Sequence, residues 1–430
     1  MQNYKGIPAE LFIWISYLAE ALPIRSIPTF IELLIGAMLI QRGFVTEAYL
    51  AVDMKRQWFS YYKWLETGKW SWVALGMQMG RLVANVLNLK HIFLIIDDFT
   101  IMRASKKAPD VGVQHQHGNK PNRPKYVNGQ VCVALSMVLE CGWINYALPL
   151  MARFARKQGN RNKLNAATLL VRVMQKAFSA RITLLLDSWY MRGRLILSLF
   201  DEGNLHVIGQ VRKDTALYDM PVIVEGKRGR KRKYGEKWTP ERVESKLRQH
   251  RVLLHIYGKK QWVRYRSTVA RARFLKGLDV LAVWVQFENE DGLSAPRLLL
   301  CTDTTLSAYE VIWQYAKRWS TEPMFNQLLH NWGLQQSWQQ TRQVLHRWTQ
   351  IRLTGYALIL LFSVKFGEPL VGLMNLTPWR ISQPVTAGRV RLCLQRIFRQ
   401  VRVRDWWNPK SRKFKPPELL DFEPLSINAT

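Results

Sequence analysis

Hydrophobic positions in the first 88 residues follow a helical pattern. Apolar side chains recur at spacings of three and four over 11–21 and again over 29–40, as expected of helices that bury one face. Pro23 and Pro28 separate these segments, because proline starts or interrupts helices. The pattern predicts a helical N-terminal region.

From residue 91 onward the pattern changes to short apolar runs. Continuous runs of this length are typical of strands buried on both faces. The strand candidates are 91–97, 126–139, 143–148, 182–187 and 205–211. Helical periodicity appears over 165–178 and 192–200. The resulting order, βββ-α-β-α-β, predicts an α/β, RNase H-like core.

Residues 212–300 interrupt this core. A polar, basic run, GKRGRKRKYGEK, occupies 226–237, and strand-like segments follow at 252–257, 262–270 and 278–287. A core-like apolar run returns at 297–301, and 307–329 has a helical pattern interrupted only by Pro323. We predict an inserted β-rich subdomain.

The C-terminal hundred residues contain an apolar helix over 351–366 and then a basic segment. In that segment Val390, Leu394, Ile397 and Val401 recur at helical spacing. Six arginines stand among them: Arg389, Arg391, Arg396, Arg399, Arg402 and Arg404. The pattern predicts a helix with one packing face and one cationic face. We expect a helical N-terminal domain at 1–88 and a helical, basic C-terminal domain at 336–430. Between them, the two parts of the core at 89–211 and 301–335 flank the insertion at 212–300.

The charge of the chain changes this picture most. It has 63 Lys and Arg against 31 Asp and Glu, a net charge of +32, and a pI of about 10.3. Such an excess favours binding to nucleic acid, because each neutralised phosphate releases condensed counterions. It favours phosphate contact over a merely solvated face for the C-terminal arginines, including Arg396 and Arg399. The N-terminal helices could equally bind a DNA end or serve as packing.

Cysteine usage and apolar length bound the compartment. The four cysteines are far apart with no CxxC, which fits a reducing cytosol. No signal-peptide pattern begins the chain, and apolar stretches such as 356–364 are shorter than the roughly 18–20 residues of a spanning helix. We expect an intracellular, cytoplasmic protein of prokaryotic type, associated with the nucleoid and not with a membrane.

Three carboxylates carry the candidate chemistry. Asp97 and Asp187 each end a buried apolar run, and Glu322 lies in a helical segment. A single Asp at a strand end is more often a cap or turn residue, so the prediction rests on the set of three. Carboxylates arranged this way suit hard divalent ions that act on a phosphodiester, here two Mg²⁺ ions with Mn²⁺ as an alternative.

The segment around Glu322 adds detail. Tyr315, Arg318 and Glu322 lie at i, i+3 and i+7, within about 60° on one helical face. Pro323 makes that shared face approximate. A simple Arg318–Glu322 helix pair is the alternative, but the grouping suits a phosphate held beside a metal.

This spacing resembles the Y-(2)-R-(3)-E-(6)-K signature of insertion-sequence DDE transposases that carry a β-strand insertion. The stretch LLLCTDTTLSAYEVIWQYAKRWSTEPMFNQL (298–328) is similar to the family's glutamate region, and IIDDFT and LLLDSWY are similar to its two aspartate regions. The resemblance spans about 90–335. It implies that Asp97, Asp187 and Glu322 hold two Mg²⁺ ions, that Tyr315 and Arg318 hold DNA near the cleaved end, and that cleavage passes through a hairpin.

The chain departs from the signature at one position. Leu329 stands where the lysine belongs, and His330 or Lys317 is a candidate substitute. Asp98 adjoins Asp97, and the family pattern favours Asp97 as the ligand. Hairpin formation requires an aromatic side chain that stacks on an unstacked base. The candidates lie in the insertion: Trp238, Trp262 and Trp284. Further DNA contacts are expected from its basic run, at Lys231, Arg232 and Lys233.

We therefore expect a DNA transposase that cleaves transposon ends and joins them to target DNA, by a cut-and-paste route. Its partners would be double-stranded DNA with terminal inverted repeats, target DNA, and a second copy of the chain in a synaptic homodimer. A domesticated, non-catalytic DNA-binding protein on the same scaffold is the alternative. A general RNase H-like nuclease is a third possibility.

Overall fold

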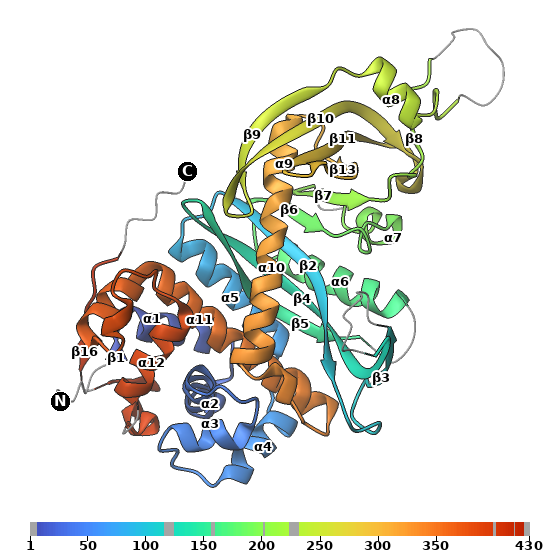
Figure 1. The fold of residues 1–430 in the computed structure, drawn as a ribbon. Helices are drawn as coiled ribbons and strands as arrows, with labels where there is room; N and C mark the ends of the chain where they lie inside the picture. Colours follow the sequence, from blue (N-terminus) through green and yellow to red (C-terminus); the bar gives the residue numbers. More distant parts are fainter. Residues whose placement is uncertain are drawn as a thin grey trace.

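The computed structural model describes residues 7–115, 124–155, 160–200, 203–222, 232–398, 401–416 and 418–424. Figure 1 shows a helical part at the bottom and a long sheet that rises from it into a β-rich upper part. A helical segment crosses the front of the sheet between the two parts. This segment carries the third predicted acid.

Five strands form the central sheet. They are β2 (His91–Met102), β4 (Tyr126–Cys141), β5 (Ile144–Phe154), β6 (Arg181–Leu186) and β7 (Leu205–Val211). The first three pair antiparallel in the order β5-β4-β2, and β6 and β7 follow in parallel. Side chains from Ile92 to Ile96 are all buried, because helices cover both faces. The predicted RNase H-like α/β core is confirmed.

Short elements complete the core. Helix α6 (Asn160–Gln175) packs on β4 and β5. Helix α7 (Gly193–Leu197) contacts α6, and β3 (Gly112–His115) pairs antiparallel with the start of β4. The predicted helices and strands of this part therefore exist, although α7 is shorter than the pattern indicated.

The insertion continues the core sheet instead of forming a separate one. Strand β13 (Arg297–Cys301) pairs antiparallel with β7 and also with β11 (Leu278–Asn289). Beyond β11 come β10 (Lys259–Ala272) and β9 (His250–Ile256), each antiparallel to its neighbour. The three strands predicted in the insertion correspond to β9, β10 and β11, except that the predicted 252–257 extends one residue beyond β9. Shorter pieces at its margin are β8 (Leu217–Tyr218), α8 (Pro240–Lys246) and β12 (Gly292–Leu293).

The helical segment in front of the sheet is nearly continuous. Helix α9 (Ala308–Ala316) leads through a 3-10 turn, Lys317–Ser320, into α10 (Thr321–Asn326) and then a wider π-helical turn, Gln327–Asn331. Pro323 does not break it. The proline stands in the first turn of α10, where its missing N–H leaves few hydrogen bonds unmade.

Helices from both ends of the chain pack together. They are α1 (Ala9–Ala19), α2 (Ile27–Leu39), α3 (Val45–Ala51), α4 (Trp58–Thr67), α5 (Trp72–Val86), α11 (Arg342–Met374) and α12 (Ala387–Phe398). Helix α11 contacts α2, α4, α5 and β5. Its buried Arg352 donates to the carbonyl of Ala37 at 3.1 Å. Strands β1 (Ile7–Pro8) and β16 (Leu419–Leu420) pair in parallel, and β14 (Trp407–Asn408) pairs with β15 (Lys413–Phe414). The domain boundaries stay predictions.

Helix α11 is longer than the predicted 351–366. Among the described residues it alone is long and apolar enough to cross a membrane, but 67% of its most apolar stretch is buried inside the protein. Such burial is typical of the core helix of a soluble protein.

The C-terminal arginines differ from their predicted cationic face. Arg389 and Arg391 lie on α12 and are buried, and Arg391 donates to the carbonyl of Asn331 at 2.6 Å. Arg404 is paired with the buried Glu32 at 2.6 Å. For these three arginines the prediction was wrong, because neighbouring helices surround them. Arg396 is exposed, and Arg399 lies outside the described residues.

Candidate active site

Asp97 and Asp98 point to opposite faces of β2, because side chains alternate along a strand. On one face, Oδ2 of Asp97 accepts a hydrogen bond from Arg318 Nη1 at 3.0 Å. On the other, Oδ1 of Asp98 lies 2.6 Å from Lys163 Nζ and accepts the Tyr190 hydroxyl at 2.8 Å. Only Asp97 therefore shares a face with Arg318. This arrangement favours Asp97 over Asp98 as a ligand.

Asp187 lies beside Asp97. Strands β2 and β6 run parallel with Ile96 opposite Leu186. Asp97, within β2, therefore lies beside Asp187, the residue that follows β6; we call this place, where β6 ends, the Asp97 edge of the sheet. Neighbouring strands are about 4.8 Å apart. Oδ1 of Asp187 accepts the backbone N–H groups of Trp189 at 3.1 Å and Tyr190 at 2.9 Å. These bonds hold the carboxylate in a tight turn after the strand.

The electrostatics of the pair are unfavourable without a further cation. Burial, with the like charge of Asp187, raises the pKa of Asp97 to about 7, against a smaller lowering effect of Arg318. Burial also raises the pKa of Asp187, although its backbone hydrogen bonds oppose the shift. One guanidinium thus compensates two buried carboxylates only in part.

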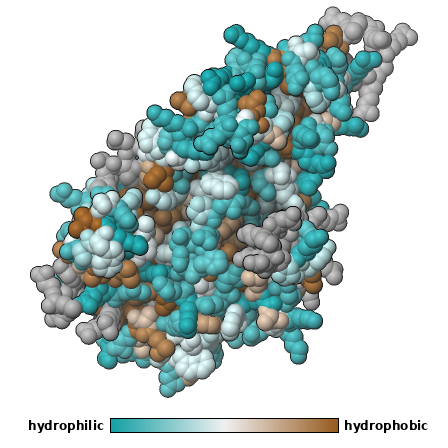
Figure 2. All heavy atoms as spheres, in the orientation of Figure 1, coloured by the Kyte–Doolittle hydropathy of each residue, from teal (hydrophilic) through white to brown (hydrophobic). Residues whose placement is uncertain are grey.

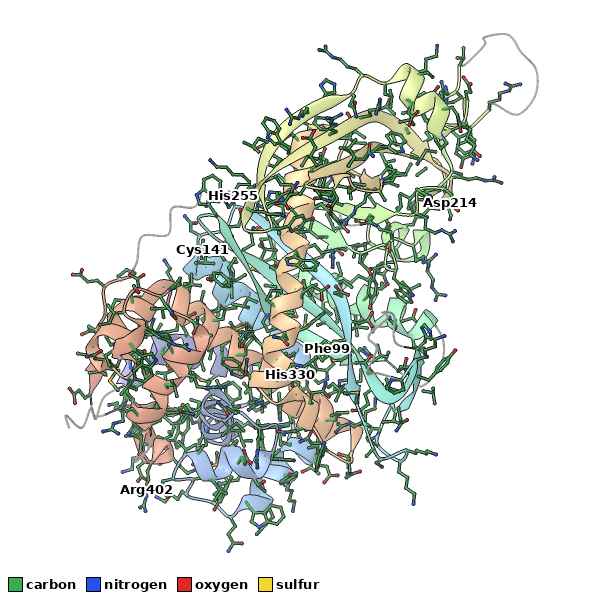
Figure 3. The ribbon with its side chains drawn as sticks, viewed as in Figure 1. Phe99, Cys141, Asp214, His255, His330 and Arg402 are labelled. Carbon is green, nitrogen blue, oxygen red and sulfur yellow. The ribbon has the colours of Figure 1, made fainter. Side chains whose placement is uncertain are left out.

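The helical segment lies along β2, and its contacts place Glu322. Arg318 reaches Asp97, and the Phe325 ring lies 4.8 Å from the Phe99 ring. Figure 3 shows Phe99 beside the lower end of α10. Glu322 stands four residues after Arg318 and three before Phe325, in the first turn of α10. Its side chain is exposed.

The donors fit a hard cation in part. Carboxylate oxygens are the ligands that Mg²⁺ prefers, and Asp97 and Asp187 meet with incomplete charge compensation. Within the described residues, however, no set of three or more His, Cys, Asp and Glu side chains is arranged to hold a metal ion. The three-acid ligand set therefore stays a prediction.

Tyr315 and Arg318 lie together as their spacing indicated. The Arg318 guanidinium is 5.9 Å from the centre of the Tyr315 ring. Burial raises the pKa of Tyr315 to about 12. Only 8% of Tyr315 is exposed, so its most direct partner is Arg318 itself.

The contacts of Lys317 exclude it as a substitute for the signature lysine. Its ammonium lies 2.7 Å from Glu140 Oε2 and 3.6 Å from the centre of the Trp313 ring. Only 1% of the residue is exposed, and burial lowers the pKa of its ammonium. His330 is exposed, just beyond α10 (Figure 3). His330 stays the candidate.

Two of the three candidate tryptophans share one pocket in the insertion. Trp238 and Trp284 have ring centres 6.5 Å apart and line a cavity of about 470 Å³. The lining also includes two acidic side chains, Asp214 and Glu244, and five basic ones: Lys213, Lys237, Arg264, Arg266 and Arg297. Trp262 lies outside this lining, 40% exposed, with the Arg251 guanidinium 3.9 Å from its ring centre. Figure 2 shows a largely hydrophilic surface over this upper part.

Only residues 232–237 of the basic run lie within the described residues. Arg232 and Lys233 are exposed near α8, at the upper end of the insertion in Figure 1. Lys231 is outside the described residues.

Sequence reasoning missed Tyr257. It forms the turn between β9 and β10 with a left-handed φ of 55°, unusual for a residue other than glycine. Its ring lies 6.1 Å from that of Trp319, and the nearby Arg318 and Arg297 oppose the burial that raises its pKa. The tip of the insertion thus packs against the 3-10 turn that carries Arg318, and Figure 3 shows His255 of β9 near Cys141 at the end of β4. The sequence indicated a turn only from Gly258 to Lys260 and left Tyr257 in the preceding strand.

The strand order, with Asp97 within β2 and Asp187 directly after β6, defines a nuclease core of the RNase H-like class. The chain belongs to the DDE superfamily of endonucleases, whose sequence model matches residues 32–269, more than half of its length. The match includes Asp97 and Asp187, and Glu322 follows it. A comparison with curated proteins finds no match. The match supports a nuclease of the DDE transposase type, and endonucleases of this superfamily generally use divalent metals.

Proposed function

We propose that this protein is a Mg²⁺-dependent DNA transposase that cuts transposon ends and joins them to target DNA by a cut-and-paste route. One observation carries the proposal. Asp97, within β2, lies beside Asp187, at the end of the parallel strand β6, and the helical segment in front of the sheet supplies both Arg318 and Glu322.

Asp97, Asp187 and Glu322 would hold the divalent ions. Bound there, such ions activate a water or a 3′-hydroxyl and stabilise the leaving oxygen. The chain's own cationic group at this edge is Arg318, whose guanidinium can bind a phosphate through two parallel hydrogen bonds. Tyr315 packs beside Arg318 and orients it. This grouping supports membership of the subgroup with the tyrosine–arginine–glutamate signature.

The Trp238–Trp284 pocket supports a hairpin route at the DNA end. Two indole rings with basic neighbours suit an unstacked base and its phosphate. In this proposal Trp262, Arg232 and Arg396 contact DNA outside the pocket. The net charge of +32 supports long contacts with duplex ends and target DNA. Because two ends must be joined, the active form would be a homodimer on nucleoid DNA.

The test is cleavage of DNA carrying the inverted repeats that flank the gene. Asp187→Ala and Glu322→Ala should each lower end cleavage at least about 1000-fold, near 4 kcal/mol in the barrier, and leave end binding within a few-fold. Glu290→Ala, which changes an exposed acid in a turn of the insertion, is the matched control and should cleave normally. Full cleavage by either site variant would remove the proposal.

The same assay decides between the alternatives. A parent protein that binds the ends but never cuts them in Mg²⁺ or Mn²⁺ would be a non-catalytic DNA-binding protein. Equal cutting of unrelated DNA would indicate a general nuclease.

A further inference from the structure

A closed set of contacts links Asp98 to the turn that holds Asp187. Asp98 accepts the hydroxyl of Tyr190 at 2.8 Å and pairs with Lys163 at 2.6 Å. Tyr190 is fully buried, so its hydroxyl has exchanged water for this one carboxylate. A buried hydroxyl that loses such a partner is costly.

The second half of the set runs through Trp189. The ammonium of Lys163 lies 4.0 Å from the centre of the Trp189 ring, a cation–π contact. Trp189 and Tyr190 are also the two residues whose backbone N–H groups donate to Oδ1 of Asp187. Each residue that orients Asp187 through its backbone is therefore anchored by its side chain to the Asp98–Lys163 pair.

We propose that Tyr190 and Asp98 are positioning residues for the carboxylate of Asp187. The Asp98–Lys163 pair, on the face of β2 opposite Arg318, fixes residues 187–190. Oδ1 of Asp187 is occupied by two N–H groups, and Oδ2 is thereby aimed at the sheet edge shared with Asp97. Groups that orient a metal ligand without touching the metal commonly change affinity about 10–100-fold when removed.

This inference rests on the proposed function, because it requires Asp187 to bind a divalent ion. The probe is Mn²⁺ binding to the DNA-free protein, followed by electron paramagnetic resonance, with the melting temperature recorded in parallel. Tyr190→Phe should weaken Mn²⁺ binding about tenfold. Cleavage by this variant should need correspondingly more Mg²⁺ for half-maximal rate and recover most of its rate at saturating metal.

Tyr61→Phe is the matched control. Tyr61 is also fully buried, and its hydroxyl also donates to a buried acid, Glu32, at 2.9 Å. That pair lies between α2 and α4, in the helical part of the molecule. Tyr61→Phe should lower the melting temperature and leave Mn²⁺ binding unchanged.

Two substitutions of Asp98 test its role. Asp98→Asn keeps an oxygen for the Tyr190 hydroxyl, whereas Asp98→Ala removes it. Mn²⁺ affinity should therefore fall less in the Asn variant than in the Ala variant.

The possible failures are distinct. Unchanged Mn²⁺ affinity in Tyr190→Phe, or an equal loss in Tyr61→Phe, overturns the positioning role alone. A parent protein that binds no Mn²⁺, or an Asp187→Ala variant that binds it as the parent does, overturns the proposed function and the inference with it.

Discussion

Charged groups are buried both at the Asp97 edge of the sheet and in the C-terminal arginine segment, but with opposite results. In the C-terminal segment Arg404 donates two hydrogen bonds to Glu32, at 2.6 and 3.0 Å. Arg391 and Arg389 are likewise held by oxygen acceptors. At the sheet edge Asp97 faces a second carboxylate, and its pKa is raised to about 7.

The difference separates two uses of charge. A buried ion pair with its hydrogen bonds made serves the fold, and removing one partner destabilises it. Like charges held together are unfavourable in the isolated protein, so strongly perturbed carboxylates in a cleft are candidates for function. The two acids thus indicate a site that binds a ligand, whereas these arginines stabilise the interior of the protein.

The largest expected effect sharpens the contrast between adjacent acids. Asp97→Asn should reduce end cleavage at least about 1000-fold, because it removes a predicted ligand. Asp98→Asn should reduce cleavage at limiting Mg²⁺ by about tenfold or less, because it keeps the Tyr190 bond. Rates on a cognate end would be compared across Mg²⁺ concentrations. The reverse ranking would reassign the ligand to Asp98.

The next effect concerns stability. Arg404→Ala leaves Glu32, which is 1% exposed, without its cation. Unfolding free energy should fall by about 3–5 kcal/mol, as measured by chemical denaturation. DNA affinity of the folded fraction should be unchanged. A loss of affinity without loss of stability would place Arg404 on a DNA surface instead.

A smaller effect is a pH-dependent change in melting temperature. Asp97 holds its proton more tightly in the folded chain, with a pKa of about 7, than in the unfolded chain, where an Asp has a pKa of about 3.9. Its contribution to stability therefore falls as pH rises from about 4 to about 7. Asp97→Asn removes this dependence.

Metal-free melting curves at pH 5, 6, 7 and 8 would check this. The melting temperature of Asp97→Asn relative to the parent should rise with pH by roughly 2 °C or more. The exposed Asp291 offers the control, since Asp291→Asn should show no such trend. A constant difference across this range would contradict the raised pKa.

The smallest effect concerns DNA contact by the C-terminal segment. Arg396→Ala should weaken binding of any duplex by a few-fold and lower the salt dependence of log K by about 0.9, the value for one phosphate contact. Arg389→Ala should instead lower stability, because Arg389 is buried against Thr377. Fluorescence anisotropy at several salt concentrations would compare the two variants.

The sequence predicted the core well where burial is continuous. Both faces of β2 and β6 are covered, so their residues read as unbroken apolar runs that locate the strands without knowledge of their partners. The length of helix α11 was underestimated because some of its buried residues are polar. Its polar residues Arg347, Gln350 and Arg352 are buried, where carbonyl groups of distant segments accept their hydrogen bonds. Periodicity cannot reveal such partners.

Pairing between distant strands was also beyond the sequence. Nothing local to β13 indicates that it joins β7 to β11 and makes the insertion part of the core sheet. The Tyr257 tip and the Trp238–Trp284 pocket depend on the same long-range pairing.

The sequence by itself determined the class of chemistry: two acids that each end an apolar run, a third in a helical segment with Tyr315 and Arg318, and a strongly basic chain. Residue identity and local spacing suffice for that. Only the tertiary structure decided that Asp97 shares the face of Arg318, that Asp98 is bound to Tyr190 and Lys163, and that Lys317 and several arginines are interior. The physical reason is that a side chain's partner, and hence its charge state and role, is supplied by segments far away in the chain.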